Sequence, residues 1–159
     1  LNAALEAKDE DAAKALLDGG DDPNEVDGDG KNALHWAAIE GCRLPLFHRI
    51  LGMIHNVNAV DNDGGTALMR AAYWDHLDMV VSLLNHPGIN VNVQDSGNYT
   101  ALHWAVGNNR PAIVAQLVSD DRVDTSLKIN YYGTPLKFAI VIGRPECEEI
   151  LREHGAPLD

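Results

Sequence analysis

Apolar residues recur along the chain at helical spacing, in short segments of two alternating kinds. In the first kind, a leucine is followed three and four residues later by small or branched apolar residues. In the second kind, larger apolar residues form one stripe, as in 46–51. Polar breaks such as Gly41 separate them, so the pattern predicts pairs of short helices joined by turns. The inner positions of the first kind are Leu34, Ala37, Ala38, Leu68, Ala71, Ala72, Leu102, Ala105, Val106, Leu136, Ala139 and Ile140.

The whole pattern returns every 34 residues. A tetrapeptide opens each first segment at Asn32, Thr66, Thr100 and Thr134. Two more series keep the same step: Asn24, Asn58, Asn92 and Ser126, then Asp27, Asp61, Asp95 and Ile129. Asn and Thr are typical N-cap residues, so each tetrapeptide predicts a helix start. A fixed period of about 20 to 50 residues indicates a protein built of stacked repeats.

These motifs resemble those of the ankyrin repeat family. The tetrapeptides match the family's Thr-Pro-Leu-His helix start, and residues 16–24 and 154–157 match its Leu-Leu…Gly-Ala-Asp-Val-Asn closing stretch. The resemblance covers essentially the whole chain. It implies an all-α solenoid of stacked helix–turn–helix units with short β-hairpin turns. We expect one domain, 1–159, of about four and a half to five repeats: 1–27 (truncated), 28–61, 62–95, 96–129 and 130–159 (cap-like).

Two copies depart from the family's tetrapeptide. Its histidine becomes Met69 and Lys137, which leaves open the usual hydrogen bond from helix start to loop in these copies. In the last repeat, Glu148 replaces an apolar residue at a position that faces the next repeat. Terminal repeats need a polar outer face, so Glu148 with Glu146 and Glu149 predicts a C-terminal cap. A solvated glutamate in the last turn is the alternative.

Composition adds a strong acidic bias. The chain has 24 Asp and Glu against 12 Lys and Arg, a net charge of −12 at pH 7, and the acids concentrate before Gly30. Repulsion argues against a nucleic-acid partner and against an anionic membrane surface. The acidic end is either a site for a basic partner or a solvated face that maintains solubility.

The cellular location is inferred only from sequence features that the chain lacks. No stretch is long and apolar enough for a membrane span, and the first residues show no signal-peptide pattern. Two cysteines, Cys42 and Cys147, argue against a disulfide scaffold. We therefore expect the cytoplasm or the nucleus.

The sequence offers no catalytic or metal-binding constellation. His35 and His103 belong to the tetrapeptides and are interpreted as structural, and His48 and His55 are seven residues apart rather than four. No Cys-x-x-Cys pair or phosphate-binding loop occurs, and the acidic turn 27–30 lacks the closing glutamate of a calcium loop. We expect no metal, no cofactor and no enzyme activity.

A candidate binding surface lies opposite the leucine–alanine face of the first helices. Residues three and four apart share a helix face, so stacking aligns these positions across the repeats. Trp, Tyr and Arg dominate binding hot spots, and the resemblance implies the same surface, because ankyrin proteins typically bind partners with the concave groove of first helices and hairpin tips. The candidate binding residues are Asp29, Lys31, Trp36, Ile39, Glu40, Asp63, Arg70, Tyr73, Trp74, Tyr99, Trp104, Asn108 and Tyr131.

The aromatic residues differ in how strongly they indicate binding. Trp36 and Trp104 stand at a position that ankyrin repeats often fill with a large scaffold residue, so packing and binding are equal alternatives. Tyr73 and Trp74 stand at more variable positions, where binding is favoured. Arg70 is expected to stack on Trp36 or Trp104 as a cation–π pair.

The last repeat ends this surface with Phe138, Val141 and Ile142. These three residues are either the apolar end of the groove or the sheltered core of the last repeat. Their exposure distinguishes the two interpretations.

The sequence therefore predicts a non-enzymatic module that binds a protein or peptide partner, with a monomer as the default state. One alternative is a regulatory ankyrin segment of a larger enzyme, channel or bacterial effector. Another is a substrate of an asparagine hydroxylase, because Asn24, Asn58 and Asn92 stand where family members can be hydroxylated.

Overall fold

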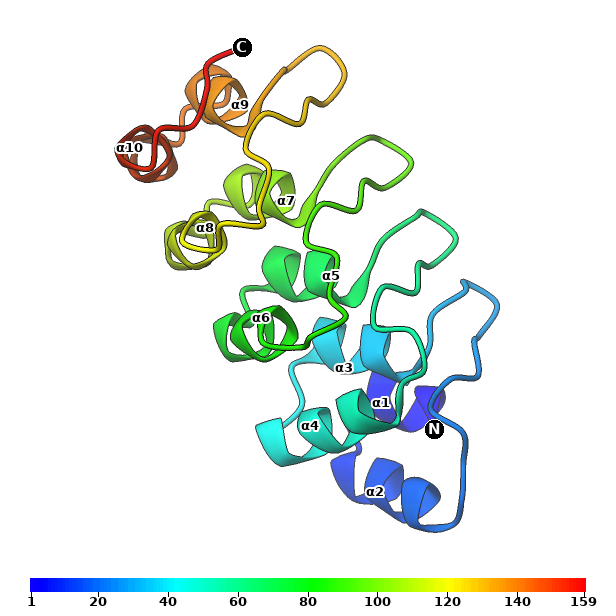
Figure 1. Ribbon diagram of the computed structural model, residues 1–159. Coiled ribbons are helices and arrows are strands. Elements are labelled where there is room, and N and C mark those ends of the chain that lie inside the picture. Colours follow the sequence, from blue (N-terminus) through cyan, green and yellow to red (C-terminus); the bar gives the residue numbers. More distant parts are fainter.

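The chain folds into ten helices arranged in five antiparallel pairs (Figure 1). The computed structural model describes residues 1–159. The helices are α1 (Asn2–Glu6), α2 (Glu10–Asp18), α3 (Ala33–Glu40), α4 (Leu44–Met53), α5 (Ala67–Trp74), α6 (Leu77–Leu84), α7 (Ala101–Gly107), α8 (Pro111–Val118), α9 (Pro135–Val141) and α10 (Pro145–Glu153). The predicted all-α repeat solenoid is confirmed. The expected β-hairpin turns contain only two isolated bridges, Val60 to Thr66 and Ile129 to Gly133.

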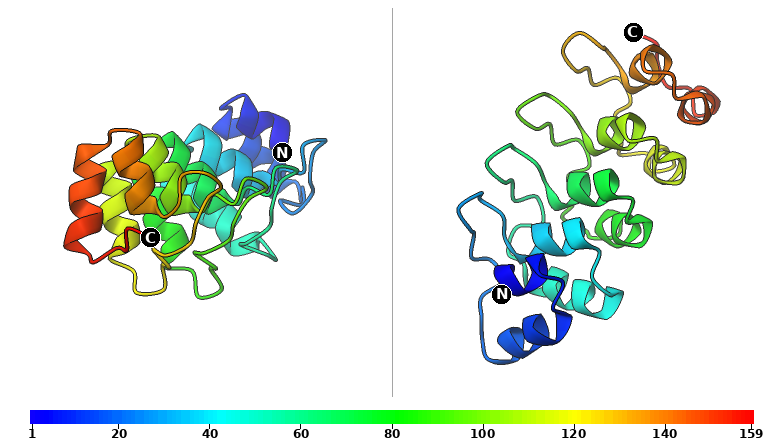
Figure 2. Two further views of the ribbon diagram at one scale, coloured as in Figure 1. Left: turned by 90° about the horizontal axis from the view of Figure 1, so that it is seen from above. Right: turned by 180° about the vertical axis from the view of Figure 1, so that it is seen from behind.

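The helix pairs stack side by side in two layers. The first helices α1, α3, α5, α7 and α9 form one layer, and the second helices form the other (Figure 1). The hairpins project beyond the first helices on one side, and the two termini lie at opposite ends of the stack (Figure 2). We call the surface lined by the first helices and by the hairpins at 27–31, 61–65, 95–99 and 129–133 the inner surface.

The helix starts follow directly from the sequence. In each of α3, α5, α7 and α9, the side chain of the N-cap residue accepts a hydrogen bond from a backbone N–H of the first turn. These N-cap residues are Asn32, Thr66, Thr100 and Thr134. Proline stands in the first turn of α4, α8, α9 and α10, where its missing N–H has no helical partner to lose. The helices α3, α4, α5, α7, α8, α9 and α10 therefore begin at positions that their own residues specify.

Small residues allow the first helices to approach closely. Ala37, Ala71 and Ala105 have no exposed surface, and each lies in the layer where neighbouring first helices meet. The 38 buried apolar residues form one cluster along the stack. Its burial is the main stabilising term, at roughly 25 cal/mol per Å² of apolar surface.

In the last repeat, the prediction for Ile140 is wrong, and the structure distinguishes the two interpretations of Phe138. Ile140 is predicted as an inner position, but its side chain is 38% exposed because no helix pair packs on the far side of α9. Phe138 is only 7% exposed and packs against the rings of Tyr99 and Tyr132. The sheltered-core interpretation therefore holds for Phe138, whereas Val141 remains 57% exposed.

Residues 157–159 contact the start of α9 in the way that the following hairpin contacts the start of α3. In the second repeat, His35 Nε2 contacts the carbonyl of Gly65 in the next hairpin at 3.1 Å. At the end of the stack, the Thr134 hydroxyl lies within 2.9 and 3.0 Å of the carbonyls of residues 157 and 158. Lys137, in the position of the family's histidine, pairs with Asp159 at 2.9 Å. The chain thus covers the start of α9 with its own last residues.

Asparagine side chains tie successive loops together. Asn24 Nδ2 donates to the carbonyl of Met53 at 3.1 Å, and its Oδ1 accepts the backbone N–H of His55 at 2.8 Å. Asn58 and Asn92 make the same two bonds to the loop that follows each of them. The spacing of the asparagines therefore has a structural explanation.

We expect the Asn58→Ala variant to lose about 1–3 kcal/mol of unfolding free energy, because two inter-repeat hydrogen bonds disappear together. Denaturant unfolding measures this loss. The matched control is Asn85→Ala, since the Asn85 side chain is exposed and makes no hydrogen bond. Equal losses in both variants would contradict a specific role for Asn58.

Two buried histidines hold the starts of α3 and α7. The Nδ1 atoms of His35 and His103 accept the backbone N–H of Asn32 at 3.2 Å and of Thr100 at 3.3 Å. Burial lowers the pKa of His103 to about 4 and also lowers the pKa of His35. Both side chains are neutral at pH 7 and serve the scaffold, in agreement with the sequence interpretation.

Stability should fall as the pH is lowered from about 6.5 to about 4. In this range the unfolded chain takes up a proton at His103 and the folded chain does not, which favours unfolding by up to about 3 kcal/mol. A glutamine can keep the capping bond, so the unfolding free energy of His103→Gln should depend less on pH across this range. Exposed His154 supplies the control, His154→Gln. An unchanged slope in His103→Gln would assign the pH dependence to other groups.

Candidate functional site

One interaction organises three of the four hairpins of the inner surface. The indole N–H of Trp36 donates to Asp27 Oδ2 at 2.6 Å, and that of Trp104 donates to Asp95 Oδ2 at 2.8 Å. In each of these hairpins, the other carboxylate oxygen of the aspartate accepts two backbone N–H groups at 2.9–3.0 Å. The aspartate therefore links the hairpin to its helix. Both indoles serve the scaffold, and their rings stay partly exposed on the inner surface.

Arg70 occupies the position in α5 that Trp36 occupies in α3 and Trp104 in α7. Its contacts differ from the cation–π contact that we expect from the sequence. Its Nε donates to Asp61 Oδ2 at 2.9 Å, a terminal nitrogen binds the same oxygen, and Asp63 lies 3.7 Å away. The expected cation–π stack on Trp36 or Trp104 is absent, so that prediction is wrong. The Asp61 side chain is 1% exposed, and a buried carboxylate requires a counter-charge more strongly than an exposed indole face does.

The cation–π contact is made by Lys31 instead. Its Nζ lies 5.3 Å from the ring centroid of Trp36 and 2.9 Å from a carboxylate oxygen of Asp29. The first hairpin thus holds a cation between an aromatic ring and a carboxylate.

The aspartates at the hairpin starts remain ionised. Burial alone would raise the pKa of Asp61, but hydrogen bonds from Arg70 and from two backbone N–H groups outweigh it, so its pKa lies below the usual value. Burial also opposes ionisation of Asp27, and its bonds from the Lys31 backbone and from Trp36 lower its pKa overall. The hairpins therefore carry negative charge at neutral pH.

Six aromatic rings form a continuous row on the C-terminal half of the inner surface. The aromatic row consists of Trp74, Tyr73, Trp104, Tyr99, Phe138 and Tyr132, in spatial order. Successive centroids are 5.1, 5.5, 4.9, 6.0 and 5.3 Å apart, which is typical of favourable aromatic pairs. Trp74 at one end is 49% exposed and Tyr132 at the other is 38% exposed. The row is thus open to solvent at both ends.

The first three hairpins are also bonded to one another at their tips. The two bonds run from the backbone N–H of Asn62 to the carbonyl of Asp29 (2.9 Å) and from that of Ser96 to the carbonyl of Asp63 (3.0 Å). Three hairpins therefore form one connected edge.

The fourth hairpin differs from the others. Ile129 replaces the aspartate, so no carboxylate organises this turn. Tyr131 adopts a left-handed conformation with φ 70°, and its side chain is fully exposed. No backbone bond joins Asn130 to Gly97, so the third and fourth hairpins lack the tip-to-tip bond of the earlier ones. Asn92 still ties the third loop to the fourth through its bonds to Arg122 and Asp124.

Three other predicted residues lie on the inner surface with partners inside the chain. Glu40 pairs with Lys8 at 3.1 Å. Asn108 donates from Nδ2 to the carbonyl four residues earlier at 2.9 Å. Ile39 is half-buried, and its carbonyl contacts His76 Nε2 at 3.1 Å. These contacts fix the side of the inner surface that lies away from the hairpins.

Sequence reasoning missed the pairing of the hairpin aspartates with the helix residue nine positions later. The sequence of the last repeat contains a signal that could have revealed this pairing. There the aspartate becomes Ile129 and, at the same time, the Trp or Arg position becomes Phe138, so an apolar residue stands at both ends of the pair. Tyr132 was also missed, although its neighbour Tyr131 was identified.

The remaining reactive groups are not arranged for chemistry. Both cysteines are unpaired and buried, and burial raises the pKa of Cys42 to about 12, far from that of a thiolate nucleophile. No group of three or more His, Cys, Asp or Glu side chains gathers in a way that would hold a metal ion. None of the helices has the length and apolar character needed to cross a membrane.

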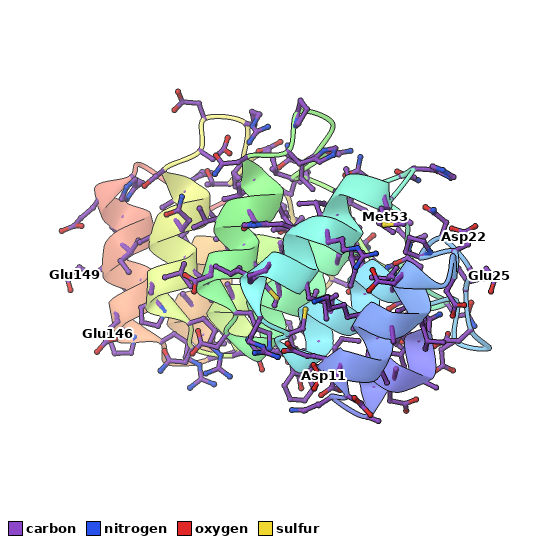
Figure 3. All side chains as sticks on the ribbon, turned by 90° about the horizontal axis from the view of Figure 1, so that it is seen from below. Asp11, Asp22, Glu25, Met53, Glu146 and Glu149 are labelled. Atoms are coloured by element: carbon purple, nitrogen blue, oxygen red, sulfur yellow. The ribbon has the colours of Figure 1, made fainter.

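Acidic side chains mark both ends of the stack. Figure 3 shows Asp11, Asp22 and Glu25 at the N-terminal end and Glu146 and Glu149 at the C-terminal end. An approaching anion is therefore repelled at either end.

We expect Arg70→Met to lose about 3 kcal/mol of unfolding free energy at pH 7, because Asp61 would be left buried without its counter-charge. The stabilisation from the lowered pKa of Asp61 is present above about pH 3.9 and is lost as the pH falls further. The difference between wild type and variant should therefore narrow between pH 7 and pH 3, as measured by denaturant unfolding.

Arg49→Met is the control, because Arg49 pairs at 2.7 Å with an exposed carboxylate, that of Asp18. Such a surface pair contributes at most about 1 kcal/mol. Equal losses in the two variants would contradict the special role of the Asp61–Arg70 pair.

The chain matches the family described as ankyrin repeats (3 copies) over residues 1–95 and 88–159. It is 32% identical over 104 residues to the SMC5-SMC6 complex localization factor protein 1 of Bos taurus, which is 65% of this chain and 10% of that protein. It is 32% identical over 158 residues to the ankyrin repeat protein nuc-2 of Neurospora crassa (93% of this chain, 14% of that protein). The putative ankyrin repeat protein YahD of Escherichia coli is 31% identical over 147 residues (90% and 73%).

The chain thus spans only a small part of the first two relatives and most of the third. The two matched ranges together cover the chain from its first residue to its last. The chain belongs to the ankyrin repeat family.

Proposed function

We propose that this chain is a non-enzymatic module that binds a protein or peptide partner on its inner surface and hairpin tips. Ankyrin repeat proteins generally mediate protein–protein interactions. The observation that carries the proposal is the aromatic row, with Trp74 49% exposed at one end and Tyr132 partly exposed at the other. Exposed aromatic clusters of this kind mark interaction sites, since Trp and Tyr supply most hot-spot energy.

Trp74 supports binding more strongly than the other two tryptophans do. Trp36 and Trp104 each donate their indole N–H to a hairpin aspartate, so the scaffold already uses them. Trp74 makes no hydrogen bond through its indole N–H, and its one aromatic partner is the neighbouring ring of Tyr73. The exposed face of the Trp74 ring contributes little to the stability of the fold, and it would contribute much to the affinity for a complementary partner.

Charge favours a basic partner. The first three hairpins carry five aspartates, against the two cations Lys31 and Arg70, which are themselves engaged with carboxylates. A basic partner would be steered toward this edge, and the association rate would fall with added salt. Nucleic acids and anionic membranes would be repelled.

We further propose that the chain acts as a monomer in the cytoplasm or nucleus and has no catalytic role. The buried neutral histidines and the inert thiol of Cys42 support this proposal. A regulatory segment within a longer protein remains the second candidate. The 10% and 14% coverage of two relatives favours it, because ankyrin arrays of this length occur there inside much larger chains.

Affinity capture followed by mass spectrometry tests the binding surface. We expect the double variant Trp74→Ala/Tyr131→Ala to lose at least about tenfold of the partner retained by wild type, since one hot-spot aromatic contributes about 1.4 kcal/mol or more. Both side chains are exposed, so the fold should be retained, as circular dichroism can verify.

The matched control is Glu149→Ala, an exposed change on α10 away from the inner surface (Figure 3). It should retain the partner at the wild-type level. Undiminished capture by the aromatic double variant would refute the assignment of the inner surface.

A further inference from the structure

We propose that the partner binds as an extended segment with basic side chains at one end and one large apolar side chain about six residues away. This inference rests on the proposed function and specifies the chemistry of its partner. The inference follows from an aromatic surface and an acidic surface that lie on the same face of the protein, and from the distance between these two surfaces.

The apolar end of the segment would lie on the C-terminal end of the aromatic row. There Tyr132 is 38% exposed, its neighbour Tyr131 is fully exposed, and Val141 is 57% exposed on α9. These groups come from α9 and from the fourth hairpin (Figure 1). A large apolar side chain placed here would remove several rings from water at once.

The basic end would lie on the first two hairpins. The side chains of Asp29 and Asp63 are largely exposed at the tips, and the carboxylates of Asp27 and Asp61 lie behind them. Lys31 already demonstrates the contact, since it sits between the ring of Trp36 and a carboxylate. An arginine or lysine of the partner would meet the same combination of groups.

The separation of the two surfaces sets the spacing within the partner. Two repeat steps separate the second hairpin from the fourth (Figure 1). Neighbouring packed helices lie about 10 Å apart, so two steps span about 20 Å. An extended chain advances about 3.3 Å per residue, so about six residues bridge that distance.

Backbone groups on the route favour an extended partner. The carbonyl of Gly97 in the third hairpin and the N–H of Asn130 in the fourth make no hydrogen bond within the chain. A helix has no free backbone groups along its length with which to pair them, whereas an extended segment does.

Synthetic peptides test this inference directly. The probe is a fluorescein-labelled peptide with two arginines, six Gly/Ser residues and one phenylalanine, and its Kd is measured by fluorescence anisotropy. We expect it to bind at least about tenfold tighter than peptides with a two-residue spacer, with alanine for phenylalanine, or with glutamines for the arginines.

Variants of the protein locate the two contacts. Tyr132→Ala should weaken the six-spacer peptide about tenfold at any salt concentration. Asp29→Asn/Asp63→Asn should weaken it about fivefold and reduce the salt dependence. Glu149→Ala should leave the Kd unchanged. Tyr131→Ala gives a second probe of the apolar end at a fully exposed site.

Several results would overturn the inference. They are equal binding of the two-spacer and six-spacer peptides, no binding of any peptide, or self-association of the protein through Trp74 in place of peptide binding. Loss of partner capture in Trp74→Ala/Tyr131→Ala together with any of these results would leave the proposed function standing without the extended segment. Undiminished capture would refute the proposed function itself.

Discussion

The close packing of neighbouring first helices is the constraint on which the rest of the structure depends. Alanine at the contact positions lets the backbones approach, and this approach places each hairpin directly beside the next. The hairpin aspartates then hold each turn against its own helix. The aromatic row exists because this arrangement repeats without a shift, so that rings from separate repeats come within van der Waals contact.

The sequence predicts most of the fold because the information is local and repeated. The helices α3, α5, α7 and α9 each have an N-cap side chain, and the apolar residues of each helix pair recur with a period of 34 residues, which is enough to derive the helix pairs. The exposure of Ile140 could not be read from the same pattern. An inner position is buried only when another repeat covers it, and a pattern within one repeat carries no information about its neighbour.

The candidate site is less predictable for the same reason. The positions of Tyr73, Trp74 and Trp104 on one face follow from helical spacing, but their edge-to-face contacts depend on the distance between repeats. Arg70 shows the limit most clearly. Its partner could be chosen only by knowing that Asp61 is buried, because electrostatic attraction to a buried carboxylate exceeds that to an exposed ring. Trp36 and Trp104 show that scaffold and surface roles can coexist in one side chain.

The missing tip-to-tip bond at the fourth hairpin gives the edge of the array a direction. Asn92 ties the third loop to the fourth, but no bond joins the tips of the third and fourth hairpins in the way that the bonds from Asn62 and Ser96 join the earlier tips. The fourth hairpin should therefore open before the first three do. Its opening would move Tyr132 away from the other rings while the carboxylate edge of the first three hairpins stays intact. The protein would thus lose its grip on apolar groups before it loses its attraction for cations.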